Sequence, residues 1–171
     1  MQTQMQTQTD IAALKFHVDN AIPKTNAYWV FGSNLAGRHG KGAARVAHDN
    51  FGAQYGVGEG PTGNSYAIPT KGRKMEILSL AVIESNVNRF LDHASVHPTR
   101  AYFVTRIGCG LAGYADEQIA PIFAARPLAN LSYPDSWRAY MEPTNVLAFQ
   151  SPAEVKAVVT PGVPSKRARP G

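Results

Sequence analysis

The sequence contains a single cysteine, Cys109, among its 171 residues. An internal disulfide is therefore excluded, which is typical of a protein in a reducing compartment. No apolar run approaches the roughly 20 residues that span a bilayer, so no membrane segment is expected. The first nine residues are polar and uncharged, unlike the start of a signal peptide. These absences together predict a cytoplasmic location.

A large excess of charge is also missing from most of the chain. The net charge is +5, but residues 1–149 carry 13 basic and 11 acidic side chains, and the remaining +3 falls on residues 150–171. Residues 1–149 are therefore nearly neutral. This charge gives little support to nucleic-acid binding, but it is sufficient for binding a small anionic ligand. The predicted organisation is a disordered segment over 1–9, a domain over 10–149 and a basic, proline-containing tail over 150–171.

The most informative segment is a glycine-rich turn between a predicted strand and a predicted helix. Residues 27–31, Ala-Tyr-Trp-Val-Phe, are typical of a buried strand, and residues 41–51 have a helical pattern. Four glycines, at 32, 37, 40 and 42, lie within the eleven residues from 32 to 42. A strand, a glycine turn and a helix in this order direct backbone N–H groups at phosphates. The first hypothesis is a nucleotide-type ligand, and the simpler alternative is an ordinary tight connection.

Two better-known phosphate motifs do not fit this turn. Arg45 stands where the dinucleotide pattern requires a third glycine or an alanine. Gly42 stands where a Walker A loop requires serine or threonine after the lysine. Dinucleotide binding and ATP hydrolysis are therefore both excluded.

A second glycine-rich turn repeats the arrangement further along the chain. Residues 101–107 predict a strand, residues 108–114 form the turn, and residues 116–125 predict a helix. A helix is also predicted over 80–94, and further strands over 64–69 and 145–149. Strands that alternate with helices indicate a layered α/β fold, whose ligands bind beyond the carboxyl ends of the strands. Because both turns follow strands, they are expected to meet at one crevice.

The two turns resemble those of macrodomains of the bacterial and phage kind, which bind ADP-ribose. Members of that family carry an asparagine just after a strand, followed by a glycine-rich loop that opens a helix. Residues 31–34, Phe-Gly-Ser-Asn, and 42–44, Gly-Ala-Ala, are similar to this first part. Residues 110–114, Gly-Leu-Ala-Gly-Tyr, are similar to the family's loop around the diphosphate. The resemblance covers residues 27–125.

The resemblance implies a three-layer α/β/α fold with a mixed central sheet and an ADP-ribose-type ligand. Asn34 is then expected to contact the distal ribose, and Asp19 is the candidate for the acid that contacts adenine. His39 and Lys41 stand where many members have glycine or small apolar residues. The implied ligand-binding residues are Gly32, Ser33, Asn34, Gly37, Gly40, Lys41, Gly42, Ala43, Gly108, Cys109, Gly110, Leu111, Ala112, Gly113 and Tyr114.

Macrodomains include proteins that only bind ADP-ribose, ADP-ribosyl hydrolases and ADP-ribose-1″-phosphate phosphatases, and the resemblance leaves this choice open. Hydrolysis needs a positioned water and a group that takes its proton, and histidine serves this role near neutral pH. The candidate catalytic residues are Asn34, His39 and Asp116. The simpler interpretation is that His39 binds phosphate and that Asp116 complements a helix N-terminus. The leading expectation is binding of an ADP-ribose derivative followed by its hydrolysis.

Other reactive residues have simpler interpretations. Cys109 is expected to pack beneath the second turn, and His93 and His97 are expected to complement the end of a helix. No cofactor and no metal ion is predicted. The expected partners are a nucleotide-type small molecule and an ADP-ribosylated protein, with no membrane.

The competing hypothesis is a non-catalytic module that binds nucleic acid or a protein partner through residues 150–171. It rests on Lys166, Arg167 and Arg169, and it is disfavoured because this tail has no aromatic residues for base stacking.

Overall fold

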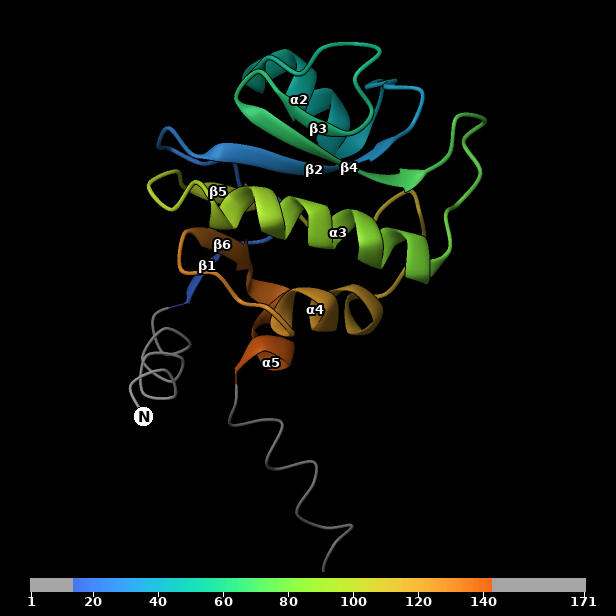
Figure 1. Ribbon diagram of the computed structural model, residues 1–171. Coiled ribbons are helices and arrows are strands. Elements are labelled where there is room, and N and C mark those ends of the chain that lie inside the picture. Colours follow the sequence, from blue (N-terminus) through green and yellow to red (C-terminus); the bar gives the residue numbers. More distant parts are fainter. Residues whose placement is uncertain (1–13, 143–171) are drawn as a thin grey trace, which may run out of the picture. The chain divides into compact units, whose positions relative to one another are not determined.

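A six-stranded mixed sheet forms the centre of the computed structural model, which describes residues 14–142 (Figure 1). The strand order is β1-β6-β5-β2-β4-β3, and all neighbours are parallel except the antiparallel pair β3 and β4. The strands are β1 Lys15–His17, β2 Tyr28–Asn34, β3 Gly60–Thr62, β4 Ser65–Lys71, β5 Tyr102–Val104 and β6 Leu131–Pro134.

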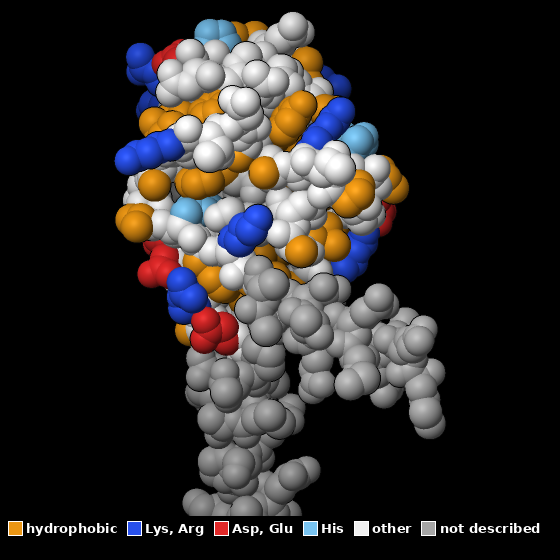
Figure 2. Space-filling model, turned by 90° about the vertical axis from the view of Figure 1, so that its left-hand side faces the viewer, with side chains coloured by type: hydrophobic (Ala, Val, Ile, Leu, Met, Phe, Trp, Pro, Cys, Tyr) orange, Lys and Arg blue, Asp and Glu red, His pale blue; other side chains and the backbone are white. Residues whose placement is uncertain are grey.

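Helices cover both faces of this sheet. The α-helices are α2 Gly42–Phe51, α3 Leu80–Ser95, α4 Asp116–Ala124 and α5 Arg138–Met141, and a 3-10 turn η1 spans Asp135–Trp137. None of the helices within residues 14–142 combines the length and the apolar character that a bilayer crossing requires. On the face at the left of Figure 1, hydrophobic side chains form separate groups among polar and charged ones (Figure 2).

The alternation of side chains along β2 divides the core into two parts. Trp29 and Phe31 pack with Ala44 and Ala47 of α2. Val30, which points the other way because successive strand residues face opposite sides, joins the larger cluster built on α3 and α4. The predicted three-layer α/β/α fold with a mixed central sheet is therefore confirmed.

Helix α3 shows why its sequence pattern is easy to interpret. The Ser79 hydroxyl accepts a hydrogen bond from the Val82 backbone N–H at 3.4 Å and caps the first turn. The apolar side chains at helical spacing are fully buried against the sheet, and burying each of the larger ones contributes roughly 1.5–3 kcal/mol relative to exposure. They are Ile83, Val87, Phe90, Leu91 and Ala94.

Several elements were not predicted or lie outside the described residues. The short strands β3 and β6 and the turn of helix α5 have too few residues to show a hydrophobic period. Strand β3 lies in a glycine-rich stretch, residues 52–64, whose composition is typical of a loop. The predicted disorder over 1–9, the predicted strand over 145–149 and the predicted tail over 150–171 lie outside residues 14–142.

Candidate functional site

A cavity of about 780 Å³ lies beyond the carboxyl ends of β2, β4 and β5. Residues of the first glycine turn form one wall, and Gly108 to Ala112 of the second turn form another. The two turns therefore meet at one crevice, as their positions after parallel strands predict. Trp29 fixes the start of α2 beside the cavity, because its indole N–H donates to the Ala43 carbonyl at 3.0 Å.

Four cationic side chains line the cavity and no carboxylate does so within residues 14–142. Arg38 and Lys41 come from the first turn, Lys71 ends β4, and Arg106 precedes the second turn. Arg38, Lys41 and Lys71 have no acidic partner within the described residues. A cavity with this charge favours an anionic ligand.

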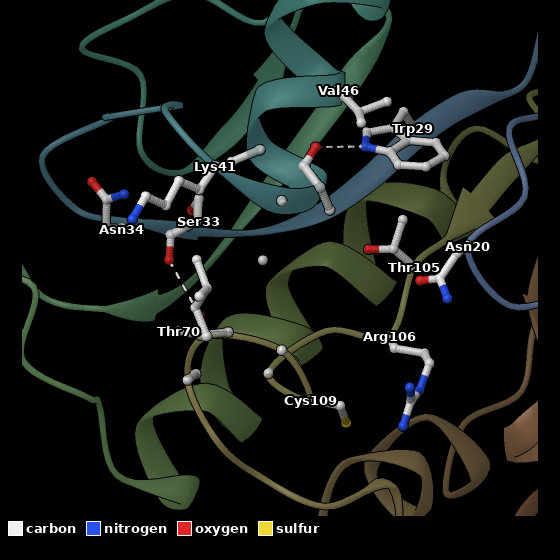
Figure 3. Close-up of a pocket in the computed structure, with 18 of the residues that line it drawn as sticks. Asn20, Trp29, Ser33, Asn34, Lys41, Val46, Thr70, Thr105, Arg106 and Cys109 are labelled. Atoms are coloured by element: carbon white, nitrogen blue, oxygen red, sulfur yellow. Dashed lines mark hydrogen bonds between the residues drawn. The ribbon is translucent and has the colours of Figure 1, made fainter.

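The two ends of the cavity differ in chemistry (Figure 3). Asn34, Ser33 and Lys41 lie together at one end, and Trp29, Val46 and Asn20 lie at the other. The second end also carries the His17 ring, which stacks on Phe103 with ring centroids 3.6 Å apart. The arrangement therefore offers a polar end and an end rich in aromatic and apolar side chains, with backbone turns between them.

Asn34 organises the first turn. Its side-chain amide donates to the Arg38 carbonyl at 2.7 Å, and its carbonyl oxygen accepts from the Arg38 backbone N–H at 3.0 Å. The Asn34 backbone carbonyl also accepts from the Gly37 N–H at 2.9 Å. Although Asn34 lines the cavity, most of its hydrogen-bonding capacity is used to shape this turn.

A second loop, residues 52–58, supports the first turn from behind. The Ser33 hydroxyl donates to the Gly58 carbonyl, and the Gly56 N–H donates to the Gly37 carbonyl at 3.0 Å. The approach is too close for side chains, because a Cβ on Gly58 would lie 2.9 Å from the Leu35 Cα. The two loops therefore form one packed unit.

His39 is fully buried between these loops and is absent from the cavity wall. Its Nε2 atom lies 2.9 Å from the Gln54 carbonyl oxygen, and its ring meets Phe31 edge-on at 5.4 Å between centroids. Its Nδ1 atom is buried and has no hydrogen-bond partner among residues 14–142. In this position His39 ties the two loops together and does not reach a ligand in the cavity.

Asp116 is also absent from the cavity wall. It begins α4, and its carboxylate accepts hydrogen bonds from Arg106 and from the indole N–H of Trp137. The hydrogen bonds from Arg106 are the main cause of the lowered pKa of Asp116. A carboxylate held in this way is a weak proton acceptor.

Most of the other candidate residues lie on the cavity wall and a few do not. Gly37, Gly113 and Tyr114 are absent from it, and the Tyr114 hydroxyl instead donates to the Leu78 carbonyl at 2.6 Å. Asp19 is absent too, although its neighbour Asn20 lines the cavity, and its carboxylate accepts from the Ser136 N–H at 3.1 Å. The candidates that line the cavity are Gly32, Ser33, Asn34, Gly40, Lys41, Gly42, Ala43, Gly108, Cys109, Gly110, Leu111 and Ala112.

Cys109 lines the cavity but is not an activated thiol. Burial is the largest of the causes that raise its pKa to about 12, and its Sγ atom donates to the Ile107 carbonyl at 3.5 Å. Since the thiolate is the nucleophilic form, this thiol is unreactive near neutral pH.

Comparisons with known proteins give two likenesses of fold. No family model matches the chain, and no curated protein matches it in sequence. A protein of unknown function from Bacteroides thetaiotaomicron is 16% identical over 71% of this chain and 96% of its own, with a TM-score of 0.49. DarTG of Thermosipho africanus, solved in complex with ADP-ribose, is 19% identical over 72% of this chain and 43% of its own, with a TM-score of 0.47. Neither likeness assigns a role to a residue of this chain.

Sequence reasoning missed several residues of the cavity wall. Lys71 and the adjacent Thr70 end β4, and Arg106 follows β5. Their position in the sequence could have identified them, because polar residues at the carboxyl end of a buried parallel strand face the ligand crevice. His17 has a comparable position, because it is the last residue of the short strand β1.

The free energy of unfolding is expected to depend on pH because His17 is partly buried in the folded protein. Burial lowers the pKa of His17 from 6.5 to about 4. Between these values the unfolded chain binds a proton that the folded chain does not, so the free energy of unfolding falls as pH decreases from about 6.5 to about 4. We expect a loss of about 2 kcal/mol, since solvent screening reduces the effect at a half-buried ring.

Urea unfolding at pH 7, 5.5 and 4.5 measures this effect. The substitution His17→Phe keeps the stack on Phe103 and removes the titrating group, so its stability should fall less over the same range. Identical pH profiles for the two proteins would contradict the prediction.

Proposed function

We propose that this protein binds ADP-ribose or a derivative of it, in the manner of a macrodomain. The observation that carries the proposal is the cavity between two backbone turns, lined by four cations and by no carboxylate of residues 14–142. A diphosphate suits the space between the turns, because backbone N–H groups and cations both bind phosphate oxygens. The stacked and apolar end suits a base, and the polar end beside Asn34 suits a distal ribose.

Binding is the part of the function that the geometry supports best. Hydrolysis of ADP-ribose-1″-phosphate or of an ADP-ribosyl linkage is the finer expectation from the macrodomain resemblance. It has less support, because neither His39 nor Asp116 lines the cavity and the only imidazole that does so, within residues 14–142, is His17. Incubation with ADP-ribose-1″-phosphate and with ADP-ribosylated protein tests hydrolysis, and product formation would overturn a binding-only function.

Removing Lys71 is expected to weaken ADP-ribose binding about tenfold, since a hydrogen bond to a charged group is worth roughly 1.5–3 kcal/mol. Titration calorimetry of the wild type and of Lys71→Ala measures the effect. Lys24→Ala is the matched control, because Lys24 is exposed and does not line the cavity. The difference should shrink at high salt, which screens exposed charges.

Two outcomes would contradict this proposal. The first is no binding by the wild type at millimolar ADP-ribose. The second is equal binding by the Lys71 and Lys24 variants, which would move the ligand away from the end of β4.

The competing function, binding of nucleic acid or a protein partner through residues 150–171, lies outside the described residues. Deleting residues 150–171 distinguishes the two functions. ADP-ribose binding should survive the deletion, and ADP-ribose should not compete with a partner that binds the tail.

A further inference from the structure

Arg106 is held by Asp116 in a two-pronged contact beside the cavity. The Arg106 Nε donates to one Asp116 carboxylate oxygen at 3.0 Å, and Nη2 donates to the other at 2.6 Å. Paired parallel hydrogen bonds of this kind fix the plane of a guanidinium group. Asp19 stands on another side of Arg106, with its carboxylate 3.9 Å from Nε.

The Asp116 carboxylate is in turn fixed by the core. The indole N–H of Trp137, which is fully buried, donates to one of its oxygens at 2.7 Å. Both oxygens therefore accept hydrogen bonds, and one of them accepts two. The carboxylate is held in place by Trp137 on the side of the core, and it holds Arg106 on the side of the cavity.

The Arg106 side chain remains accessible from the cavity. It lines the cavity wall, and 37% of its side-chain surface is exposed. No hydrogen bond among residues 14–142 uses its third nitrogen, Nη1. Figure 3 places this guanidinium below Thr105 and Asn20 and beside Cys109 of the second turn.

We propose that Arg106 donates hydrogen bonds to the diphosphate of the ligand from an orientation set by Asp116. Asp116 is then a positioning residue, which acts on the ligand through Arg106. The inference rests on the proposed function. It assigns a role to Arg106, which the sequence pattern does not single out, and a different role to Asp116, which the sequence pattern offers as a catalytic candidate.

The pair also differs in charge from the other cations of the cavity. Asp116 compensates the charge of Arg106, whereas Arg38, Lys41 and Lys71 have no acidic partner within residues 14–142. Arg106 therefore supplies directed hydrogen bonds with little net charge. Its removal should weaken binding at every salt concentration to a similar degree, while removal of Lys71 should matter most at low salt.

The test is calorimetric titration of the full chain with ADP-ribose and, separately, with inorganic pyrophosphate. We expect Arg106→Ala, Arg106→Lys and Asp116→Asn each to weaken both ligands about tenfold, since each breaks the charged hydrogen bonds that orient the donor. Arg106→Lys keeps the charge and loses the planar fork, so it separates orientation from charge. Thermal melting of each variant confirms that it is folded.

Val87→Ala is the matched control for a merely structural effect. Val87 is a buried residue of α3 that neither lines the cavity nor bonds to Arg106 or Asp116, so its truncation should lower stability while both affinities stay within twofold. If Arg106→Lys binds like the wild type, or if Val87→Ala weakens binding as much as Asp116→Asn, the positioning role is overturned.

The two ligands separate failure of this inference from failure of the proposed function. Arg106-dependent binding of pyrophosphate without binding of ADP-ribose would overturn only the proposed function. Binding of ADP-ribose that is unchanged in the Arg106 and Asp116 variants would overturn only the positioning role. A wild type that binds neither ligand would overturn both.

Discussion

The substitution Gly110→Phe is expected to abolish ADP-ribose binding and to leave the fold intact. Gly110 lies at the exposed tip of the second turn and lines the cavity. A Cβ added there would meet no atom within 4 Å, and Gly110 is not among the glycines with positive φ. The backbone therefore accepts a side chain without strain, and a phenyl ring would occupy the space that the ligand needs.

We expect a loss of affinity of more than about 100-fold, because a phenyl ring in the cavity occupies the volume that the ligand needs and so excludes it. Calorimetry measures the affinity, and the melting temperature should stay within about 3 °C of the wild type. Gly40→Phe tests the opposite wall in the same way, since Gly40 also lines the cavity and has open space around it.

The control for added hydrophobic surface is Thr99→Phe, at an exposed position away from the cavity wall. Its affinity should equal that of the wild type. If Gly110→Phe and Gly40→Phe both bind ADP-ribose normally, the ligand does not lie between the two turns.

The layers and the two turns were predictable because their signals are local. Helix α3 has a serine cap and a complete apolar face, and β2 begins with a continuous apolar run from Tyr28 to Phe31. The glycine turns follow strands in the chain itself, so their meeting at one crevice follows from parallel pairing alone. The described structure confirms the layered architecture that these patterns indicate.

The roles of His39 and Asp116 depend on contacts that a sequence does not display. His39 lies in a glycine-rich turn, where either solvent or the core can receive its ring. What buries it is the loop over 52–58, whose Gln54 carbonyl lies 2.9 Å from the imidazole Nε2. Asp116 lies at a helix N-terminus, where an acidic residue is common, but its partners Arg106 and Trp137 come from other segments of the chain. Composition gives no information about either pairing.

The substitution Gly37→Ala is expected to destabilise the fold and the cavity together. Gly37 is buried with a φ of +66°, and a Cβ there would lie 2.7 Å from the Gly56 Cα. The obstructing atoms belong to the backbone, so they cannot rotate away as a flexible side chain does. A left-handed alanine costs about 1 kcal/mol and overpacking typically costs about 1–3 kcal/mol more.

We therefore expect a loss of about 3 kcal/mol in the free energy of unfolding, which corresponds to a melting temperature lower by about 10 °C for a domain of this size. Binding of ADP-ribose should weaken as well, since the turn that holds Arg38 and Lys41 rests on this contact. Gly56→Ala is the matched control: its φ is also positive, at +91°, but a Cβ there meets nothing within 4 Å. It should lose only the conformational part, about 1 kcal/mol. Equal melting temperatures for Gly37→Ala and Gly56→Ala would show that the close packing of the two loops does not hold the first turn in place.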